Sequence, residues 1–138
     1  MRQAFLTIRV STNGPGLYDV TDKVMAFVQT EKIADGLLTC YIRHTSASLL
    51  IQENADPDVL KDLKDFFSQL AKKGMDYRHI AEGPDDMPSH IRAALTQTSI
   101  GIPVKSGKPA LGTWQGLYVF EHRDAPHQRE MLLHFIGD

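Results

Sequence analysis

Residues 79–90, with the sequence His-Ile-Ala-Glu-Gly-Pro-Asp-Asp-Met-Pro-Ser-His, hold the densest group of chemically capable side chains in the chain. Two imidazoles and three carboxylates fall within this short segment, around a Gly-Pro turn. Such groups bind divalent metals or transfer protons. A second polar segment, residues 43–48, follows a strongly apolar run. We expect the two segments to meet in space and form one site.

Three histidines in these segments are candidate metal ligands: His44, His79 and His90. Three converging imidazoles suit zinc, with nitrogen–metal distances of about 2.0–2.1 Å. Pro88 favours a helix start, which would place His90 in the first helical turn, where the helix dipole disfavours imidazolium. A neutral ring is the form that binds a metal. The alternative is that each histidine is a hydrogen-bonded structural residue.

The carboxylates of this segment, together with His90, are candidate catalytic groups. Asp86, with Asp85 beside it, would act as a proton-transfer partner or bind the metal, often through water. The alternative role for Asp86 is the N-cap of the following helix. Glu82 would orient a ligating histidine or be solvated.

Several other polar side chains suit an anionic or heterocyclic substrate. Thr45, Ser46 and Ser48 offer hydroxyl and backbone N–H groups to phosphate oxygens, or else form local turn bonds. Arg123 would clamp a phosphate through its forked donors or pair with a neighbouring acid. Trp114 would stack on a flat heterocycle or pack in the core.

These groups must be positioned by a mixture of helices and strands. Apolar patterns predict strands at residues 3–10, 36–43, 48–53, 99–104, 110–112, 114–122 and 129–136, the last two as a hairpin. Helices are predicted after Thr21, after Asp56-Pro57 with one apolar stripe ending near Gly74, and from Asp86 or Met87 to about Gln97. We expect a single domain, residues 1–138, of the α+β class: a largely antiparallel, jelly-roll-like β-sandwich with two to three helices packed outside.

Composition narrows the function classes. Fifteen Lys and Arg against 17 Asp and Glu give a net charge of −2, and no basic run is present, so we expect no nucleic-acid partner. No apolar segment is long enough to cross a bilayer, so no membrane partner is expected. The single cysteine, Cys40, fits a reducing compartment. The expected localisation is cytoplasmic.

Five segments of the chain, spread from His44 to Arg123, resemble the YjbQ-like family, also called the secondary thiamine-phosphate synthase family. They are His44-Thr45-Ser46-Ala47-Ser48, Glu53-Asn54-x-Asp56-Pro57, Glu82-Gly83-x-Asp85-Asp86-Met87-Pro88-Ser89-His90, Gly112-Thr113-Trp114-Gln115-Gly116 and Glu121-His122-Arg123. The resemblance covers nearly the whole chain.

This resemblance implies a β-sandwich-like domain assembled as a homotrimer, with a divalent metal near His44, His79 and His90. Zinc suits the histidines, and magnesium suits a diphosphate substrate. The implied activity is weak thiamine-phosphate synthesis, in which a pyrimidine methyl diphosphate alkylates the nitrogen of a thiazole phosphate and releases diphosphate. Thr45, Ser46, Gln115 and Arg123 would contact the small phosphorylated substrate. The alternatives are a metal-dependent hydrolase and a non-catalytic binding module for a small anionic ligand.

Overall fold

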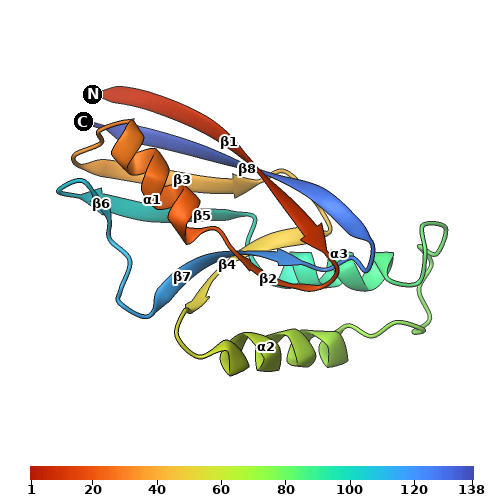
Figure 1. Ribbon diagram of the computed structural model, residues 1–138. Coiled ribbons are helices and arrows are strands. Elements are labelled where there is room, and N and C mark those ends of the chain that lie inside the picture. The colour runs from red at the N-terminus through yellow and green to blue at the C-terminus, as the bar shows by residue number, and fades with distance from the viewer.

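The computed structural model describes residues 1–138 as two antiparallel sheets and three helices (Figure 1). The larger sheet has the strand order β1-β8-β3-β5-β6. Its strands are β1 (Arg2–Asn13), β8 (Pro126–Gly137), β3 (Gly36–Ile42), β5 (Ser99–Lys105) and β6 (Lys108–Pro109). The smaller sheet has the order β2-β7-β4, from β2 (Gly16–Asp19), β7 (Gln115–Glu121) and β4 (Ala47–Glu53). The expected α+β class with largely antiparallel sheets is confirmed.

The hydrophobic core lies on the inner face of the larger sheet. Side chains alternate between the two faces of a strand, so Leu38, Cys40 and Ile42 of β3 point inward and are buried, whereas Leu37 and Tyr41 point outward and are exposed. Helix α1 (Thr21–Thr30) and the smaller sheet supply the opposite side of one cluster of 21 buried residues.

Helix α2 (Pro57–Leu70) lies on the other side of the smaller sheet, away from the larger one (Figure 1). Its start follows from local chemistry, because the Asp56 carboxylate accepts a hydrogen bond from Asp58 N at 2.9 Å and Pro57 opens the first turn. The apolar stripe predicted for this helix is present, but none of its residues is buried. Phe66 and Leu70 are 61% and 53% exposed, so α2 is a cover over the smaller sheet and not part of the core.

Two predictions about the strands are wrong. The segments 114–122 and 129–136 form strands, but not a hairpin, because β7 pairs with β2 and β4 while β8 pairs with β1 and β3. Residues 110–112 do not form a strand either; the short strand β6 precedes them. The chain between β7 and β8 therefore crosses from one sheet to the other, which places Arg123 at the junction of the two layers.

Helix α3 (Asp86–Leu95) lies at one end of the sandwich, beside the start of β4. An isolated bridge between Leu49 and Gln97 ties the chain after α3 to the smaller sheet. The long segment from Ala71 to Asp85, which contains His79, connects α2 to α3 without regular structure. None of the three helices is both long enough and apolar enough to traverse a lipid bilayer.

Candidate metal centre

Helix α3 presents two of the candidate ligands. Residues four apart lie on one face of a helix, so Asp86 and His90 project to the same side. Asp85, not Asp86, occupies the N-cap position, and its side chain makes no capping bond. His90 is the fifth helical residue, so it lies in the second turn and not in the first, and the helix-dipole argument for its neutrality does not hold.

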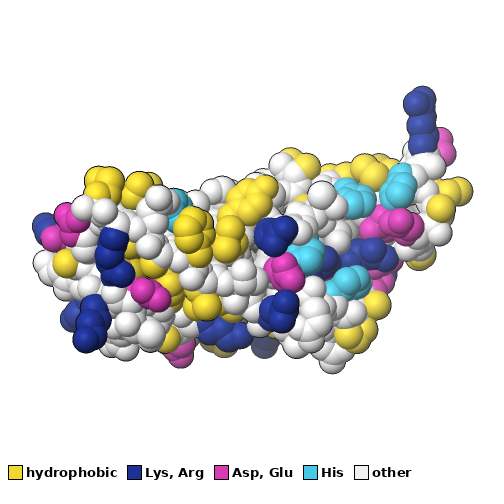
Figure 2. Space-filling view, turned by 90° about the horizontal axis from the view of Figure 1, so that it is seen from above, with side chains coloured by type: hydrophobic (Ala, Val, Ile, Leu, Met, Phe, Trp, Pro, Cys, Tyr) yellow, Lys and Arg dark blue, Asp and Glu magenta, His cyan; other side chains and the backbone are white.

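His79, Asp86 and His90 form a compact cluster whose ligand atoms all lie within 4.8 Å of one another. Oδ2 of Asp86 is 2.6 Å from Nε2 of His79 and 3.1 Å from Nε2 of His90. Asp86 is almost fully buried, whereas the imidazoles are partly exposed, so the cluster opens to solvent on the histidine side. Figure 2 shows histidine side chains gathered with acidic and basic groups at this end of the molecule, while several hydrophobic side chains are exposed over the other half of the same face.

The hydrogen bonding of His90 shows that these residues fit a metal. Nδ1 of His90 lies 2.9 Å from the carbonyl oxygen of Thr45, and because a carbonyl only accepts, Nδ1 carries a proton. Nε2 is then the nitrogen that faces the Asp86 carboxylate, 3.1 Å away, where either a ring proton or a metal ion would satisfy the carboxylate. A ligating histidine held through its other nitrogen by a carbonyl is the usual arrangement in metal sites.

Arg123 holds the carboxylates in place. Its Nη1 donates to Oδ1 of Asp86 at 2.7 Å, its Nε to Oδ2 of Asp85 at 2.9 Å, and its Nη2 to the carbonyl of Glu82 at 3.1 Å. The forked donors of Arg123 are thus engaged within the protein. The expectation that Arg123 clamps a phosphate is not what the geometry supports; Arg123 orients Asp86, the carboxylate of the candidate metal centre.

These contacts also set the ionisation of both acids. Burial raises the pKa of Asp85, but hydrogen bonds from Arg123 and the backbone N–H of Asp124 outweigh it and hold that pKa below its ordinary value. Burial likewise raises the pKa of Asp86. The hydrogen bond with His79 and the charges of His90 and Arg123 lower it, and the net pKa of Asp86 is below its ordinary value. Both carboxylates are therefore anionic near neutrality. Asp85 serves as the anchor for Arg123, and Glu82 lies at the rim, 3.7 Å from Nε2 of His79.

His44 lies outside the cluster of ligand atoms. Its Nε2 accepts the backbone N–H of Glu130 at 2.8 Å, so that nitrogen has no lone pair free for a metal. Burial, and next the charge of Arg129, lower the pKa of His44, so its ring is neutral. In place of the expected third imidazole, the structure brings the Asp86 carboxylate to the two histidines.

The three hydroxyl residues after His44 differ in burial: Ser46 and Ser48 are buried, and Thr45 is exposed. Ser46 is buried and its Oγ accepts from Nη2 of Arg129 at 3.1 Å. Ser48 is fully buried, with its Oγ 2.9 Å from Nε2 of His122. Neither is accessible to a substrate. Thr45 is exposed, orients His90 through its carbonyl, and is the one of the three that remains near the site.

Trp114 and Gln115 lie at the other end of β7 from Arg123. Seven strand residues separate these ends, which corresponds to about 20 Å at the usual rise of a strand. Trp114 is 64% exposed, and Oε1 of Gln115 accepts from the N–H of Gly112 in a local turn. Within one chain, neither residue reaches the cluster.

Two depressions flank the metal cluster. On the His90 side, a cleft of about 260 Å³ is lined by His44, Thr45, His90, Ala93, Ala94 and Thr98. On the His79 side, a second depression of about 250 Å³ has Met75, Tyr77, Ile80, Pro84 and Met87 on its walls. A ligand spanning both depressions would pass over His79 and His90.

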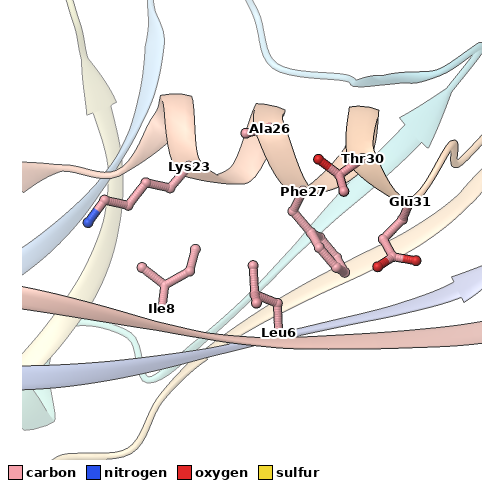
Figure 3. Close-up of a pocket in the computed structure, with 7 residues that line it drawn as sticks. All are labelled: Leu6, Ile8, Lys23, Ala26, Phe27, Thr30 and Glu31. Carbon is pink, nitrogen blue, oxygen red and sulfur yellow. The ribbon is translucent and has the colours of Figure 1, made fainter.

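The largest groove of the molecule is elsewhere, between α1 and β1 (Figure 3). It measures about 320 Å³ and is lined mainly by aliphatic and aromatic carbon, with Lys23 and Glu31 among the side chains drawn around it. It contains no histidine and no pair of converging carboxylates, so it offers no comparable chemistry.

Sequence reasoning missed a buried ion pair that supports the site. Nε and Nη2 of Arg129 donate to the two carboxylate oxygens of Glu121, which is fully buried. A signal was present, because Arg129 shares the inward register of Met131 and Leu133, and Glu121 shares that of Leu117 and Val119. Two opposite charges at inward positions of facing strands indicate a buried pair.

Fold and site together define a class: a two-sheet α+β domain with a candidate metal centre of two histidines and one aspartate beside the sheet junction. A family model described as UPF0047 protein YjbQ-like matches residues 6–138. The chain belongs to the YjbQ-like, or UPF0047, family.

Relatives and solved structures agree with this assignment. A UPF0047 protein of Synechocystis sp. is 54% identical over 94% of this chain and 88% of its own length. The UPF0047 protein YjbQ of Escherichia coli O157:H7 is 37% identical over 96% of both chains. A crystal structure of an uncharacterized YjbQ/UPF0047-family protein from Clostridium acetobutylicum superposes with a TM-score of 0.86 at 33% identity, covering 96% of this chain and 99% of that one. The hypothetical protein APE1520 from Aeropyrum pernix K1 gives 0.87 at 29% identity over the full length of both.

Proposed function

We propose that this protein is a metal-dependent enzyme acting on phosphorylated heterocycles, with His79, Asp86 and His90 as the metal ligands. One observation carries the proposal: the Thr45 carbonyl fixes a proton on Nδ1 of His90 and so turns Nε2 towards the Asp86 carboxylate, within the cluster that also contains His79. A histidine held through its other nitrogen by a carbonyl is the usual arrangement of a metal ligand.

A divalent ion held there would act as a Lewis acid on a phosphate oxygen and offset its developing negative charge. Zinc suits two nitrogens and one carboxylate oxygen, and magnesium suits a site completed by diphosphate oxygens. The chain's own residues do the positioning: Arg123 holds Asp86 ionised and oriented, and Thr45 holds the ring of His90.

The two flanking depressions support a substrate with a charged part and a flat apolar part. The phosphate would lie over the cluster, near the hydroxyl groups of Thr45 and Thr98, and a heterocycle would lie against Tyr77, Ile80 and Met87. Thiamine-phosphate synthesis from a pyrimidine methyl diphosphate and a thiazole phosphate fits this description. Its specific support is the resemblance of the motif segments, and it is proposed as one observable reaction of the site.

We also propose that the protein assembles as a homotrimer. The outer face of the larger sheet exposes Phe5, Leu37 and Tyr41, which are 61%, 44% and 46% accessible. Exposed apolar side chains gathered on one sheet face are typical of an interface between chains. Light scattering on the purified protein should give three times the chain mass, and a monomer at all concentrations would contradict the proposal.

The metal centre is tested by loading metal-free protein with zinc and measuring bound metal by mass spectrometry. The wild type should hold one ion per chain, and His90→Ala should lose at least about 10-fold in affinity because one of three ligands is gone. His127→Ala is the matched control, since His127 contacts only the Ala125 carbonyl outside the cluster. Equal binding by wild type and His90→Ala would refute the site.

Activity is tested by incubating metal-loaded protein with the two phosphorylated substrates and measuring thiamine phosphate and diphosphate. The proposal expects both products from wild type and neither from Asp86→Asn. Diphosphate or phosphate release without thiamine phosphate would favour a metal-dependent hydrolase. Saturable binding without any product would favour the non-catalytic binding module.

A further inference from the structure

A second, separate cavity lies between α2 and the smaller sheet. Its volume is about 120 Å³, and its walls include Lys64 and Ser68 of α2, Lys73 after α2, Arg92 of α3 and His122 after β7. Phe67 of α2 closes it from one side through an edge-to-face contact with Phe120, their ring centres 5.4 Å apart. The cavity shares no residue with the metal cluster or with the depressions flanking it.

Arg92 is a buried cation with too few partners. The residue is only 7% exposed, and its single hydrogen bond runs from Nη2 to the carbonyl of Ala71 at 2.7 Å. Its Nε is buried and has no partner at all. Burial lowers the pKa of Arg92, and Asp124, Tyr77 and Asp85 raise it only through their charges, since none of them forms a hydrogen bond with Arg92. A buried charge without a counter-ion is unfavourable, so the side of the guanidinium that Ala71 leaves free indicates a missing anion.

His122 supplies a second unpaired group on the same cavity. It is fully buried, and its Nδ1 has no partner. The single hydroxyl proton of Thr96 goes to the carbonyl of Arg92 at 2.8 Å, because a carbonyl only accepts, so the Ser48 hydroxyl donates to Oγ of Thr96 at 2.6 Å. Oγ of Ser48 then accepts from Nε2 of His122, 2.9 Å away, and a neutral imidazole protonated on Nε2 has a lone pair on Nδ1. The unpaired group of His122 is therefore an acceptor, which the hydroxyl of a protonated phosphate would satisfy, while Nε of Arg92 is a donor that a phosphate oxygen would satisfy.

The charges around the cavity also favour an anion. Lys73 is neutralised by Asp124, whose Oδ2 lies 2.5 Å from Nζ. Glu121 also lines the cavity but is paired with Arg129, so Arg92 and Lys64 remain against the one acid Asp65, which leaves an excess of positive charge. One water molecule needs only about 10–15 Å³ of cavity volume, so the cavity of about 120 Å³ has room for a tetrahedral oxyanion.

We propose that the cavity between α2 and β7 is a binding site for a phosphate-type oxyanion, held by the guanidinium of Arg92 and, through the hydroxyl of the phosphate, by Nδ1 of His122, with Lys64 and Ser68 at its entrance. The site is distinct from the metal centre and is independent of the activity proposed there. Its ligand is inorganic phosphate or the phosphate group of a small metabolite. An occupied site would bridge α2 to α3 and β7.

The experiment titrates inorganic phosphate into metal-free protein and follows binding by calorimetry and thermal stability, against chloride at the same ionic strength. The wild type should show one saturable site and a rise in Tm that chloride does not produce. Arg92→Met should abolish saturable binding, and in phosphate-free buffer it should be as stable as wild type or more stable, because an unpaired buried charge is removed.

Lys64→Met should weaken phosphate binding by about 10-fold, the usual effect of losing one charge-assisted contact. Lys61→Met is its matched control, because Lys61 lies one turn earlier on α2, pairs with Asp58 and is not on the cavity. His90→Ala should bind phosphate as the wild type does, which separates this site from phosphate held at the metal centre. If Arg92→Met does not fold, the Lys64 and Lys61 pair decides the result. Absence of a saturable site in wild type, or equal binding by both lysine variants, would overturn the proposal.

Discussion

The buried pair of Glu121 and Arg129 gives the sharpest test of how the site is supported. The Glu121 carboxylate accepts two bonds from Arg129, one from Thr12 at 2.5 Å, and the backbone N–H groups of His122 and Arg123 at 2.9 and 3.1 Å. It therefore fixes the backbone that carries Arg123 to Asp85 and Asp86. The structure predicts that breaking this pair destabilises the fold and also disturbs the candidate metal centre.

Arg129→Met leaves the Glu121 carboxylate buried without its counter-ion, a change that costs about 3–5 kcal/mol. With an unfolding entropy of about 2.1 cal/mol/K per residue over 138 residues, 1 kcal/mol corresponds to about 3–4 °C in Tm. The expected fall is thus about 10–17 °C. Glu121→Gln should cost a similar amount, because it leaves the Arg129 guanidinium buried and unpaired.

The double variant Glu121→Gln with Arg129→Met distinguishes the pair from general core damage. Neither partner then leaves an uncompensated charge, so the loss should be well below the sum of the two single losses, with an interaction energy of about 1–3 kcal/mol. Urea unfolding of all four proteins, followed by circular dichroism, measures it. Additive losses within about 0.5 kcal/mol would refute the coupling.

Four further changes have defined outcomes. Burial, and next the charge of Arg92, lower the pKa of His122 to about 3. Below about pH 6.5 the unfolded ring therefore binds a proton that the folded ring does not bind, so the free energy of unfolding should fall from about pH 6.5 towards pH 3. Urea unfolding of His122→Gln should show a smaller dependence on pH over this range. Ser48→Ala leaves a buried imidazole nitrogen unpaired and should cost about 1–3 kcal/mol by the same assay. Burial raises the pKa of the Cys40 thiol to about 12, so a disulfide reagent at neutral pH should label it only after unfolding, and rapid native labelling would contradict its burial. Gly36→Ala would place a Cβ against the carbonyl of Ile136 and the ring of Phe135, and calorimetry should show a Tm lower by several degrees, about 1–3 kcal/mol.

Local patterns predicted the helices well, and the strand pairing poorly. The cap at Asp56 and the proline after it lie beside the helix that they start, so the information is local. The partners of β7 are β2 and β4, which are distant in sequence, and β7 is covered on both faces because α2 lies outside it. No alternation of polar residues marks such a strand, and its nearness in sequence to β8 wrongly favoured a hairpin.

In the candidate site, too, contacts between residues close in sequence were predictable and contacts between distant residues were not. Asp86 and His90 were predictable as neighbours because helical spacing brings them together, and His79 is only seven residues from Asp86. The partner of His44 is the backbone N–H of Glu130, 86 residues away, which no spacing could indicate. The role of Arg123 was also hidden, since a forked guanidinium suits a substrate phosphate and an internal carboxylate equally well.

Because no residue of α2 is buried, this helix has the weakest hold on the rest of the domain, and its backbone amides should exchange with deuterium well before those of β3 or β8. The hydrophobic core cluster between the two sheets contains no residue of α2. Transient detachment of α2 would open the cavity that contains Arg92 and leave the hydrophobic core intact. A small molecule could then enter a cavity that α2 otherwise covers. The helix with the fewest buried contacts would thus control access to the cavity that contains the unpaired guanidinium of Arg92.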